Sequence, residues 1–333
     1  MMLTNRNLFK IVLNSVLGLI LIIIWLQFVN IKEILETISK VKPLSLIPIF
    51  FFMFLSPVIR AIRLKIFLNE IKQVPLFPLI FLNGVAMMLN FLIPIRAGEI
   101  AKGLYLNTRF GLPLAKSVIW VFLDRFLDFL VVLVLAIGLF FIIPTSLNIM
   151  FITVIIIIFI VALILTYLAI FQVDFTRKIV NFLKHILIEK HIKIYFERFS
   201  NFILDCFTIF NRHPKDLLLL CILTVLAYAA DAFIWYFTFI ALGFQQAYLK
   251  MYLGQLLSAL AYLIPAAPGY VGSAEASGTL ILSGVFGVEV NLASAMIVLF
   301  HILSALFVLV FGFISVFSLK LDLGLILKKV NFN

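Results

Sequence analysis

Three ionisable residues lie close together inside one of the most apolar segments of the chain. Asp124, Arg125 and Asp128 interrupt the segment 121–130, whose other residues are all apolar. On a helix, Asp124 and Asp128 lie one turn apart on one face. Because buried charges are costly unless they are paired, the pattern indicates either an ion pair that locks helix packing or a cation in the wall of a polar cavity.

A second cluster, Arg96, Glu99 and Lys102, follows a break in another apolar stretch, and we expect a new helix to begin there at Ala97 or Gly98. The unpaired N–H groups and the positive dipole end of that helix, together with Arg96 and Lys102, could hold a phosphate. The alternative is that these cations are ordinary positive charges of a cytoplasmic loop.

A third irregular segment, 264–272, contains Pro265, Pro268, Gly269 and Gly272. Lipid cannot satisfy the free N–H and C=O groups of an irregular backbone, so this segment must line a polar cavity or be buried in protein. Gly269 is therefore a candidate for a binding site. Glu275 follows at the start of the next half-helix, where it is either a binding carboxylate or a simple charge at a helix end.

Two further ionisable residues are isolated in apolar surroundings. Asp231 has no cation within one turn of its own helix and must find a partner elsewhere, with Arg60, Arg125 and His301 as the candidates. His301 is the only histidine that we expect inside the membrane. It either relays protons or makes a hydrogen bond that supports packing.

The sequence lacks the signatures of common enzyme classes. It contains no Walker loop, no nucleophile elbow and no pair of histidines at metal-binding spacing. Its two cysteines, Cys206 and Cys221, lie in apolar surroundings at different expected depths, which favours neither a disulfide nor a metal site. We therefore expect no metal and no cofactor, and a protein that is transporter-like rather than enzymatic.

Composition indicates which elements must position these residues. Of 333 residues 65% are apolar and 12% are charged, whereas soluble domains are about half apolar and about a quarter charged. Apolar runs that can cross about 30 Å of hydrocarbon recur along the chain and leave no room for a separate soluble domain. The sequence predicts an all-α polytopic membrane bundle with about six full crossings, near residues 8–29, 44–66, 115–143, 147–171, 217–242 and 291–319.

Two other apolar stretches, 75–111 and 250–288, are broken in the middle, and we interpret them as re-entrant helical hairpins. With the amino terminus in the cytoplasm, the cytoplasmic segments hold 21 basic residues and the outside segments hold 4. Segment 172–216 is basic and cytoplasmic, and its apolar residues follow the spacing of two amphipathic surface helices. This pattern predicts a multi-pass protein of the cell membrane with both termini in the cytoplasm.

The two broken stretches resemble copies of one unit within a single transmembrane domain, 1–333. The first repeat covers 44–143 and the second covers 217–319. The matches, at offsets of 171 and then 176, are Arg60 with Asp231, Leu92-Ile93-Pro94 with Leu263-Ile264-Pro265, Glu99 with Glu275, Phe110-Gly111 with Phe286-Gly287, and Arg125 with His301. The charge count gives the repeats opposite orientations, which predicts an inverted repeat; a chance match between two apolar sequences is the alternative.

Segments 96–102, 121–128 and 264–275, in this order and spacing, resemble the flippase-like family called the lysylphosphatidylglycerol synthase transmembrane region, and the resemblance covers nearly the whole chain. Full-length synthases of that family join such a domain, held to move the aminoacylated lipid between leaflets, to a soluble aminoacyl-transferase domain. This sequence has no such second domain, so the resemblance implies a standalone member. It also implies cavity positions at Arg96, Glu99, Asp124, Arg125, Pro268, Gly269 and Glu275.

These features favour a lipid translocase that moves a phospholipid or a lipid-linked headgroup between leaflets. In this hypothesis Arg96 and Arg125 bind the phosphate, while Glu99, Asp231 and Glu275 bind a cationic or hydroxylated headgroup. One alternative is a membrane-embedded transferase that uses a polyprenyl-phosphate or lipid donor. Another is a non-transporting subunit that docks a cytoplasmic enzyme through residues 174–216.

The net charge of +11 bears on the expected partners. In a membrane protein such an excess sets topology and favours anionic headgroups, whereas a nucleic-acid partner is the interpretation for a soluble basic domain. We therefore expect membrane lipids as partners, with anionic phospholipid or lipid phosphate favoured, and no nucleic acid. A cytoplasmic protein partner belongs to the docking alternative.

Overall fold

A computed structural model of the chain describes residues 5–69, 72–93, 97–146, 149–186, 193–194, 200, 214–261 and 267–321. Within these ranges the regular elements are all helices and no strand occurs, which confirms the all-α prediction for the described part. In chain order they are α1 (Asn5–Leu26), α2 (Ile31–Ser39), η1 (Pro43–Leu46), α3 (Ile47–Asn69), α4 (Leu76–Leu92), α5 (Ala97–Phe110), α6 (Leu114–Phe140), α7 (Ile149–Phe171), α8 (Val173–Ile186), α10 (Pro214–Ala241), α11 (Tyr248–Ala261), η2 (Pro268–Tyr270), α12 (Ser273–Thr279), η3 (Leu280–Val285) and α13 (Val290–Leu319).

Several of these helices can cross a membrane. Among the described residues, three are long and apolar enough on their own: η1 with α3, α10 and α13. The bent pair of α1 and α2, which meet at 89°, makes a fourth if it is counted as one span. The other two predicted crossings coincide with α6 and α7, which have 27 and 23 residues. The helices support a membrane protein, while six crossings stay a prediction.

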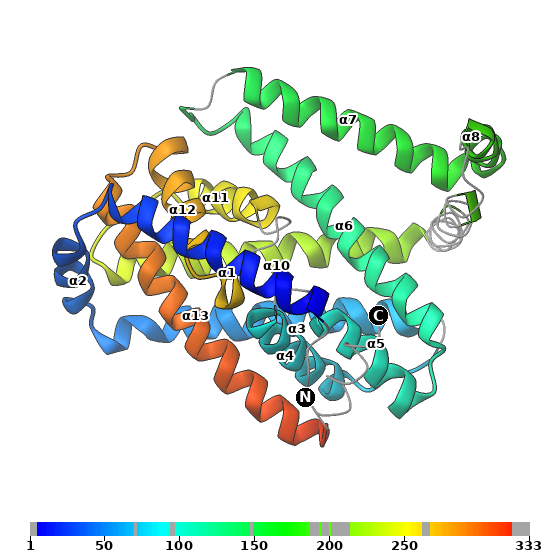
Figure 1. Cartoon of the computed structure of the whole chain (residues 1–333), viewed down its shortest axis with the longest axis horizontal. Helices are drawn as coiled ribbons and strands as arrows, with labels where there is room; N and C mark the ends of the chain where they lie inside the picture. Colours follow the sequence, from blue (N-terminus) through cyan, green and yellow to red (C-terminus); the bar gives the residue numbers. More distant parts are fainter. Residues whose placement is uncertain are drawn as a thin grey trace.

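The amino-terminal helices precede both predicted repeats. α2 turns away from α1, is capped by the Asn30 side chain, and buries only Ile34 among its residues. α1 packs on the second broken segment, where the Trp25 indole N–H lies 3.2 Å from the hydroxyl oxygens of Thr279 and Ser294. Figure 1 shows α1 crossing the bundle next to α12 and α13. α1 thus covers one side of the second hairpin.

Both predicted hairpins consist of shorter helices separated by a break: α4 and α5 in the first, and α11 followed by η2, α12 and η3 in the second. The half-helices after the breaks begin at Ala97 and Ser273, which are 176 residues apart. The long helices that follow begin at Leu114 and Val290, again 176 residues apart. Helix boundaries therefore recur at the offset of the sequence matches.

α3 and α10 run antiparallel through the centre of the bundle. Arg60 of α3 contacts Asp231 of α10, and Arg63, about one turn later in α3, contacts Thr224, which lies two turns earlier in α10. Apolar side chains of both helices fill the core on either side of these contacts. The first long helices of the two predicted repeats are thus direct neighbours of opposite direction.

A second antiparallel pair joins the first hairpin to the last helix. Gly84 of α4 lies against Ser315 of α13, and Met88, one turn later, lies against Gly312. In the other half, α11 packs on α6. The first arm of each hairpin therefore packs on the long helix that follows the other hairpin.

The predicted amphipathic segment is described only in its first part. α8 carries Phe175, Ile179 and Phe182 on one exposed side, with the spacing of an amphipathic helix. Figure 1 shows α8 turned across the end of α7, which diverges from α6 toward that end. The second predicted helix, within 192–210, falls almost entirely outside the described residues.

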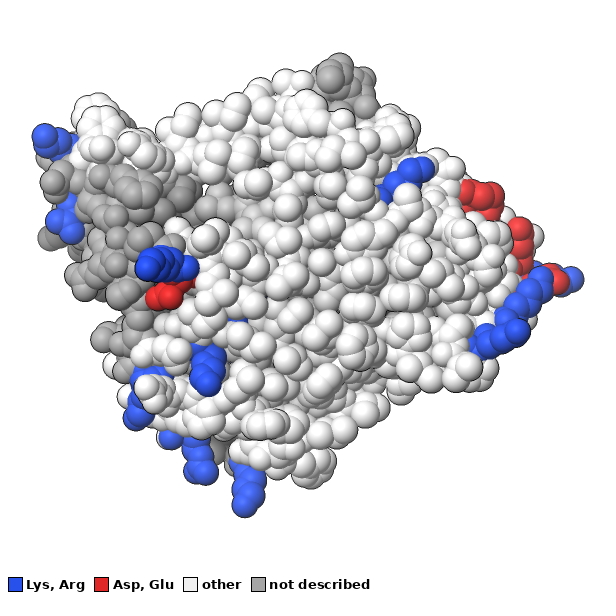
Figure 2. All heavy atoms as spheres, turned by 180° about the vertical axis from the view of Figure 1, so that it is seen from behind, with Lys and Arg blue, Asp and Glu red and all other residues white. Residues whose placement is uncertain are grey.

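The surface has an uncharged band between charged ends. Figure 2 shows a broad face nearly free of charged groups, bordered by mainly basic side chains toward α8 and by acidic and basic side chains at the opposite end, toward α2. Large apolar side chains are exposed along the long helices, including Leu19, Phe51 and Phe313. Contact with lipid explains so large an apolar surface, which would favour aggregation in water.

Gly98, in the first turn of α5, tests the packing of the first hairpin. A Cβ atom added there would lie 2.1 Å from the carbonyl oxygen of Ala86 in α4. Gly98→Ala should therefore push α5 away from α4 and destabilise the protein by about 1–3 kcal/mol or more, measured as a lower unfolding temperature in detergent. Gly138→Ala in α6 is the control, because a Cβ there meets nothing within 4 Å. Equal unfolding temperatures for the two variants would contradict this packing.

Candidate functional site

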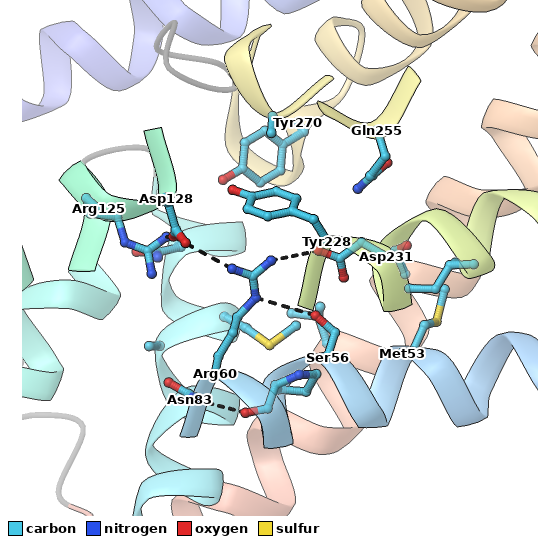
Figure 3. A pocket seen from close by; sticks show the side chains of 18 of the residues that line it. Met53, Ser56, Arg60, Asn83, Arg125, Asp128, Tyr228, Asp231, Gln255 and Tyr270 are labelled. Carbon is cyan, nitrogen blue, oxygen red and sulfur yellow. Dashed lines mark hydrogen bonds and ion pairs between the residues drawn. The ribbon is translucent and has the colours of Figure 1, made fainter. Parts of the chain in front are cut away.

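A cavity of about 430 Å³ lies inside the bundle, between helices of both broken segments and the long helices α3, α6, α10 and α13. Figure 3 shows polar side chains that converge on it from several helices. Apolar side chains such as Met53 and Phe300 complete the wall. Its polar lining comprises Ser56, Arg60, Asn83, Asn90, Glu99, Lys102, Arg125, Asp128, Tyr228, Asp231, Gln255, Tyr270 and Ser304.

Arg60 connects α3 to α10 on the cavity wall. Its Nη2 lies 2.7 Å from Oδ2 of Asp231, and its Nη1 lies 3.7 Å from Oδ2 of Asp128. Its Nε–H donates to the Ser56 hydroxyl at 3.4 Å, and the guanidinium lies 5.0 Å from the centre of the Tyr228 ring. Of the three cations that could pair with Asp231, the structure therefore selects Arg60, its counterpart in the sequence repeat.

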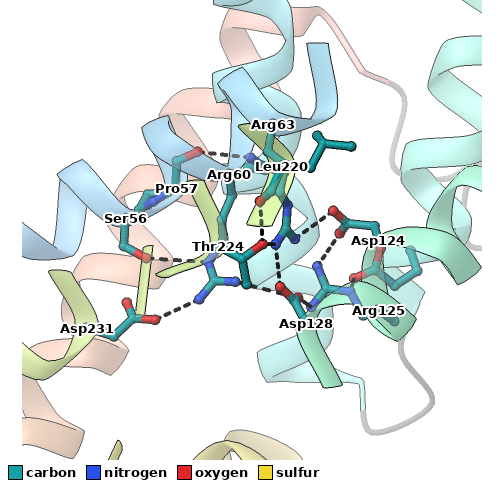
Figure 4. A network of polar contacts seen from close by, with 12 residues as sticks. Ser56, Pro57, Arg60, Arg63, Asp124, Arg125, Asp128, Leu220, Thr224 and Asp231 are labelled. Carbon is teal, nitrogen blue, oxygen red and sulfur yellow. Dashed lines mark hydrogen bonds and ion pairs between the residues drawn. The ribbon is translucent and has the colours of Figure 1, made fainter. Parts of the chain in front are cut away.

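Arg63 lies deeper, behind the cavity wall, with a side chain that is 1% exposed. Its Nη2 lies 2.6 Å from Oδ1 of Asp124, and its Nη1 contacts Oδ1 of Asp128. The same Nη1 donates to the Thr224 hydroxyl of α10 at 2.6 Å. Figure 4 shows Arg63 between α6 and α10, so that one guanidinium fastens three helices together.

Arg125 is the most exposed cation of the cluster. Its side chain is 36% exposed and lines the cavity. Its Nη2 lies 2.6 Å from Oδ2 of Asp124, its Nη1 lies 3.2 Å from Oδ2 of Asp128, and its Nε lies 4.0 Å from Oε1 of Glu99. Glu99 lies 3.6 Å from the Lys102 ammonium, so the cluster continues onto α5.

The cluster is electrically balanced. It contains four cations and four carboxylates: Arg60, Arg63, Lys102 and Arg125, and Glu99, Asp124, Asp128 and Asp231. An unpaired charge in such surroundings costs several kcal/mol, so an incoming charged ligand must replace an existing ion-pair partner. Among the described residues, no group of three or more His, Cys, Asp and Glu side chains could hold a metal ion.

Five of the predicted site residues lie together on the cavity wall: Glu99, Lys102, Arg125, Asp128 and Asp231. Asp124 lies beside them, between two guanidinium groups. Arg96 falls outside the described residues. At the start of α5, the Gly98 N–H donates to the Asn90 side chain at 2.8 Å, so one group expected to hold a phosphate already has a partner.

The other three predicted residues form a separate contact at the second break. Nε2 of His301 lies 2.7 Å from the carbonyl oxygen of Gly269, and Nδ1 contacts Oε1 of Glu275. The N–H of Gly272 donates to Oε2 of Glu275 at 2.7 Å. From this contact, the neighbouring Tyr270 reaches the cavity wall.

Sequence reasoning missed Arg63. The charge count assigned Arg60 and Arg63 to a cytoplasmic segment and Lys102 to another, which is wrong because all three carry ion pairs within the bundle. Without these three residues the segments predicted to be cytoplasmic still hold 18 basic residues, against 4 in the outside segments, so the predicted orientation does not change. The usable signal was that Arg60 and Arg63 both fall inside the predicted span 44–66, three residues apart and therefore on one helix face.

A model of the family described as Lysylphosphatidylglycerol synthase TM region matches residues 11–312. The chain belongs to this family. The match includes both broken segments and every cavity-lining residue named above, and it confirms the resemblance seen in the sequence. Membership in the lysylphosphatidylglycerol synthase TM region family supports a multi-pass membrane protein related to lipid handling. A comparison with curated proteins finds no match.

Arg63→Met should strongly destabilise the protein. Loss of one partner of a buried ion pair costs about 3–5 kcal/mol, and here two carboxylates, Asp124 and Asp128, lose a shared cation. Lys65→Met is the control, since it removes a cation from the same helix outside the cluster and should change stability by less than about 1 kcal/mol. The measurement is the unfolding temperature of each variant in detergent. An Arg63→Met protein as stable as wild type would contradict the structural role of Arg63.

Proposed function

We propose that this protein is a lipid translocase, which moves a phospholipid or a lipid-linked headgroup between the two leaflets. The observation that carries the proposal is an ion-paired cavity inside a bundle whose outer surface is apolar. Such a cavity offers charged partners to a headgroup while the acyl chains remain in lipid. Its volume of about 430 Å³ is that of a small-molecule site and suits a headgroup. Family membership, which relates the chain to lipid handling, agrees with this function.

We also propose that the two halves form an inverted repeat. Helix starts recur 176 residues apart, α3 and α10 are antiparallel, and each hairpin packs on the long helix that follows the other. In addition, Glu99 lies near Arg125, while its counterpart Glu275 contacts His301, the counterpart of Arg125. A twofold relation accounts for all of these features and is common in secondary transporters.

The charge distribution supports one orientation. Basic side chains gather at the α8 end in Figure 2, and segment 172–216 alone holds eight basic residues. We therefore place this end and both termini in the cytoplasm of a cell membrane. α4 and α5 would then form a hairpin that enters from the cytoplasmic side, and α11 and α12 one that enters from outside. Helices of both hairpins line the same cavity.

Arg125 is the proposed phosphate ligand. It is 36% exposed, against 1% for Arg63. If Arg125 turned to a phosphate, the surrounding carboxylates would keep other cations: Arg63 for Asp124, Arg63 and Arg60 for Asp128, and Lys102 for Glu99. A guanidinium can also bind a phosphate through two parallel hydrogen bonds. The cluster can therefore release this cation without leaving a carboxylate unpaired.

The charge balance bears on the headgroup. A phosphate alone would give the occupied cavity a net negative charge, whereas a headgroup with both a phosphate and an amine would keep it neutral. Glu99 and Asp231, which both line the cavity, are the carboxylates that can accept hydrogen bonds from an amine or hydroxyl. We therefore expect headgroups that carry both a phosphate and an amine to move faster than simple anionic headgroups. The net charge of the chain alone had favoured anionic lipids.

The geometry disfavours the transferase alternative. That alternative uses Glu99 or Asp124 as a general base. Oδ1 of Asp124 lies 2.6 Å from Arg63, and Oδ2 lies 2.6 Å from Arg125, so both oxygens are engaged. Glu99 faces the cavity but lies near Lys102 and Arg125. A general base must be within hydrogen-bond reach of the proton that it removes, whereas each Asp124 oxygen already faces a guanidinium.

The test is lipid movement by the purified protein in liposomes. Fluorescent anionic and zwitterionic phospholipids and polyprenyl-phosphate lipids are placed on one leaflet, and their accessibility to a quencher is followed with time. Arg125→Ala should lower the initial rate about 10- to 100-fold, because it removes charge-assisted hydrogen bonds worth about 1.5–3 kcal/mol. The unfolding temperature should change much less than for Arg63→Met.

Arg109→Ala is the matched control. It also removes an arginine, but Arg109 is exposed in the last turn of α5, away from the cavity lining, so this variant should move lipid at the wild-type rate. Equal rates for Arg125→Ala and wild type would rule out Arg125 as the ligand. A wild-type protein that moves no lipid class would rule out the translocase, and formation of a new lipid product would favour the transferase.

A further inference from the structure

The His301 side chain joins the two sides of the second break. Nε2 contacts the carbonyl oxygen of Gly269 at 2.7 Å, and Nδ1 contacts the carboxylate of Glu275, whose other oxygen accepts the Gly272 N–H. Both side chains are largely buried, at 14% and 13% exposure. Every polar atom of the two side chains thus has a defined partner.

These contacts determine where protons must be. A carbonyl oxygen only accepts hydrogen bonds, so Nε2 of His301 must carry a proton. Nδ1 of a neutral imidazole is then a bare acceptor, and a carboxylate is also an acceptor. The observed contact between Nδ1 and Oε1 of Glu275 therefore requires one more proton between them, either on the histidine or on the glutamate. The pair stores one exchangeable proton.

The contact also fixes an unusual backbone beside the cavity. Gly269, Tyr270 and Gly272 have φ angles of 68°, 57° and 81°, and a positive φ is uncommon for a residue such as tyrosine. The ring of Phe91 lies 6.3 Å from the Tyr270 ring and 6.3 Å from the His301 ring. Figure 3 shows Tyr270 among the side chains that line the cavity. Separation of His301 from its partners would free this part of the wall to move.

Few other ionisable groups surround the pair. Tyr270 is the one on η2, and the sequences of α4, α12, η3 and α13 contain none besides Glu275 and His301. α1 meets the break at Gly18, eight residues or about 12 Å after its last basic residue, Lys10. The proton on the pair is therefore not set by a nearby third charge on these elements.

Other helices also pack on α13 or α12. Their charged residues either have ion-pair or hydrogen-bond partners of their own or lie far along the helix from Glu275 and His301. α3 and α10 contribute Arg60 and Asp231, which pair with each other at 2.7 Å. Glu33 of α2 accepts a hydrogen bond from Asn291, about 15 Å along α13 from His301. α11 carries Lys250 near its first residue, opposite the end that leads into the break. None of these four charged residues forms an ion pair with Glu275 or His301.

We propose that Glu275 and His301 form a proton-binding site that controls the position of Tyr270 on the cavity wall. In the protonated state one proton joins Oε1 of Glu275 to Nδ1 of His301. On deprotonation this proton passes to a water molecule, Nε2 keeps its own proton, and a carboxylate then faces a nitrogen lone pair. Because two acceptors repel, the pair separates and Tyr270 moves. The use of this proton to drive lipid movement rests on the proposed function.

The test is nuclear magnetic resonance of the full-length protein in lipid nanodiscs. His185, His191 and His213 are the other histidines and are replaced by Gln, so that ¹⁵N-labelled His301 is observed alone. We expect Nε2 to stay protonated across the titration while Nδ1 loses its proton. 3-Fluorotyrosine at position 270 should report a change with the same midpoint. Glu275→Gln should move the His301 midpoint by about one pH unit or more, and Ser277→Ala, on the same helix, should leave it in place.

Each outcome decides the proposal. Two results with native Glu275 would overturn it: an Nε2 without a proton at any pH, or a Tyr270 signal that does not change during the titration. A His301 midpoint that is the same in Glu275→Gln would also overturn it. These spectra do not depend on transport. In liposomes, a pH gradient should alter the wild-type rate of lipid movement, and Glu275→Gln should remove that dependence. No dependence in wild type would overturn the coupling alone, whereas no lipid movement would overturn the translocase and leave the proton site standing.

Discussion

The cost of an unpaired charge in a low-dielectric interior is the constraint on which this structure depends. Arg63 is the most deeply buried cation of the cluster, and its guanidinium contacts two carboxylates of α6 and a hydroxyl of α10. Figure 4 shows the resulting connection between α3, α6 and α10. Hydrocarbon contacts alone would let such helices slide, whereas ion pairs fix their register. The shape of the cavity follows from that register.

The same constraint gives the two halves different chemistry. In the first half, Glu99 lies near an exposed arginine, Arg125, at the cavity. In the second half, the corresponding glutamate contacts His301, which also reaches a backbone carbonyl in the break. An arginine stays charged, whereas a histidine can gain and lose a proton. In our account the first half binds the headgroup and the second half responds to protons.

Much of the fold could be predicted from the sequence because it depends on local patterns. Apolar runs predicted the long helices, and Pro and Gly predicted the breaks between them. The start of α5 at Ala97 agrees with the predicted start at Ala97 or Gly98. The ion pairs of Arg60 and Arg63 join residues more than 60 positions apart, and there the sequence left three candidates for Asp231. The charge count failed at Arg63 because it treats every cation near a helix end as solvent-exposed, whereas this side chain points into the bundle. Tyr228, Gln255 and Tyr270 carried no signal, since aromatic and amide residues are common in apolar helices.

The most direct measurement is a cryo-electron-microscopy structure of the protein in nanodiscs with a phospholipid that it moves. Our account predicts headgroup density in the cavity, with the phosphate within about 3 Å of the Arg125 guanidinium and the ion pairs of Arg63 intact. A headgroup on the outer surface of the bundle, with Arg125 still paired to Asp124 and the cavity free of lipid, would contradict the account.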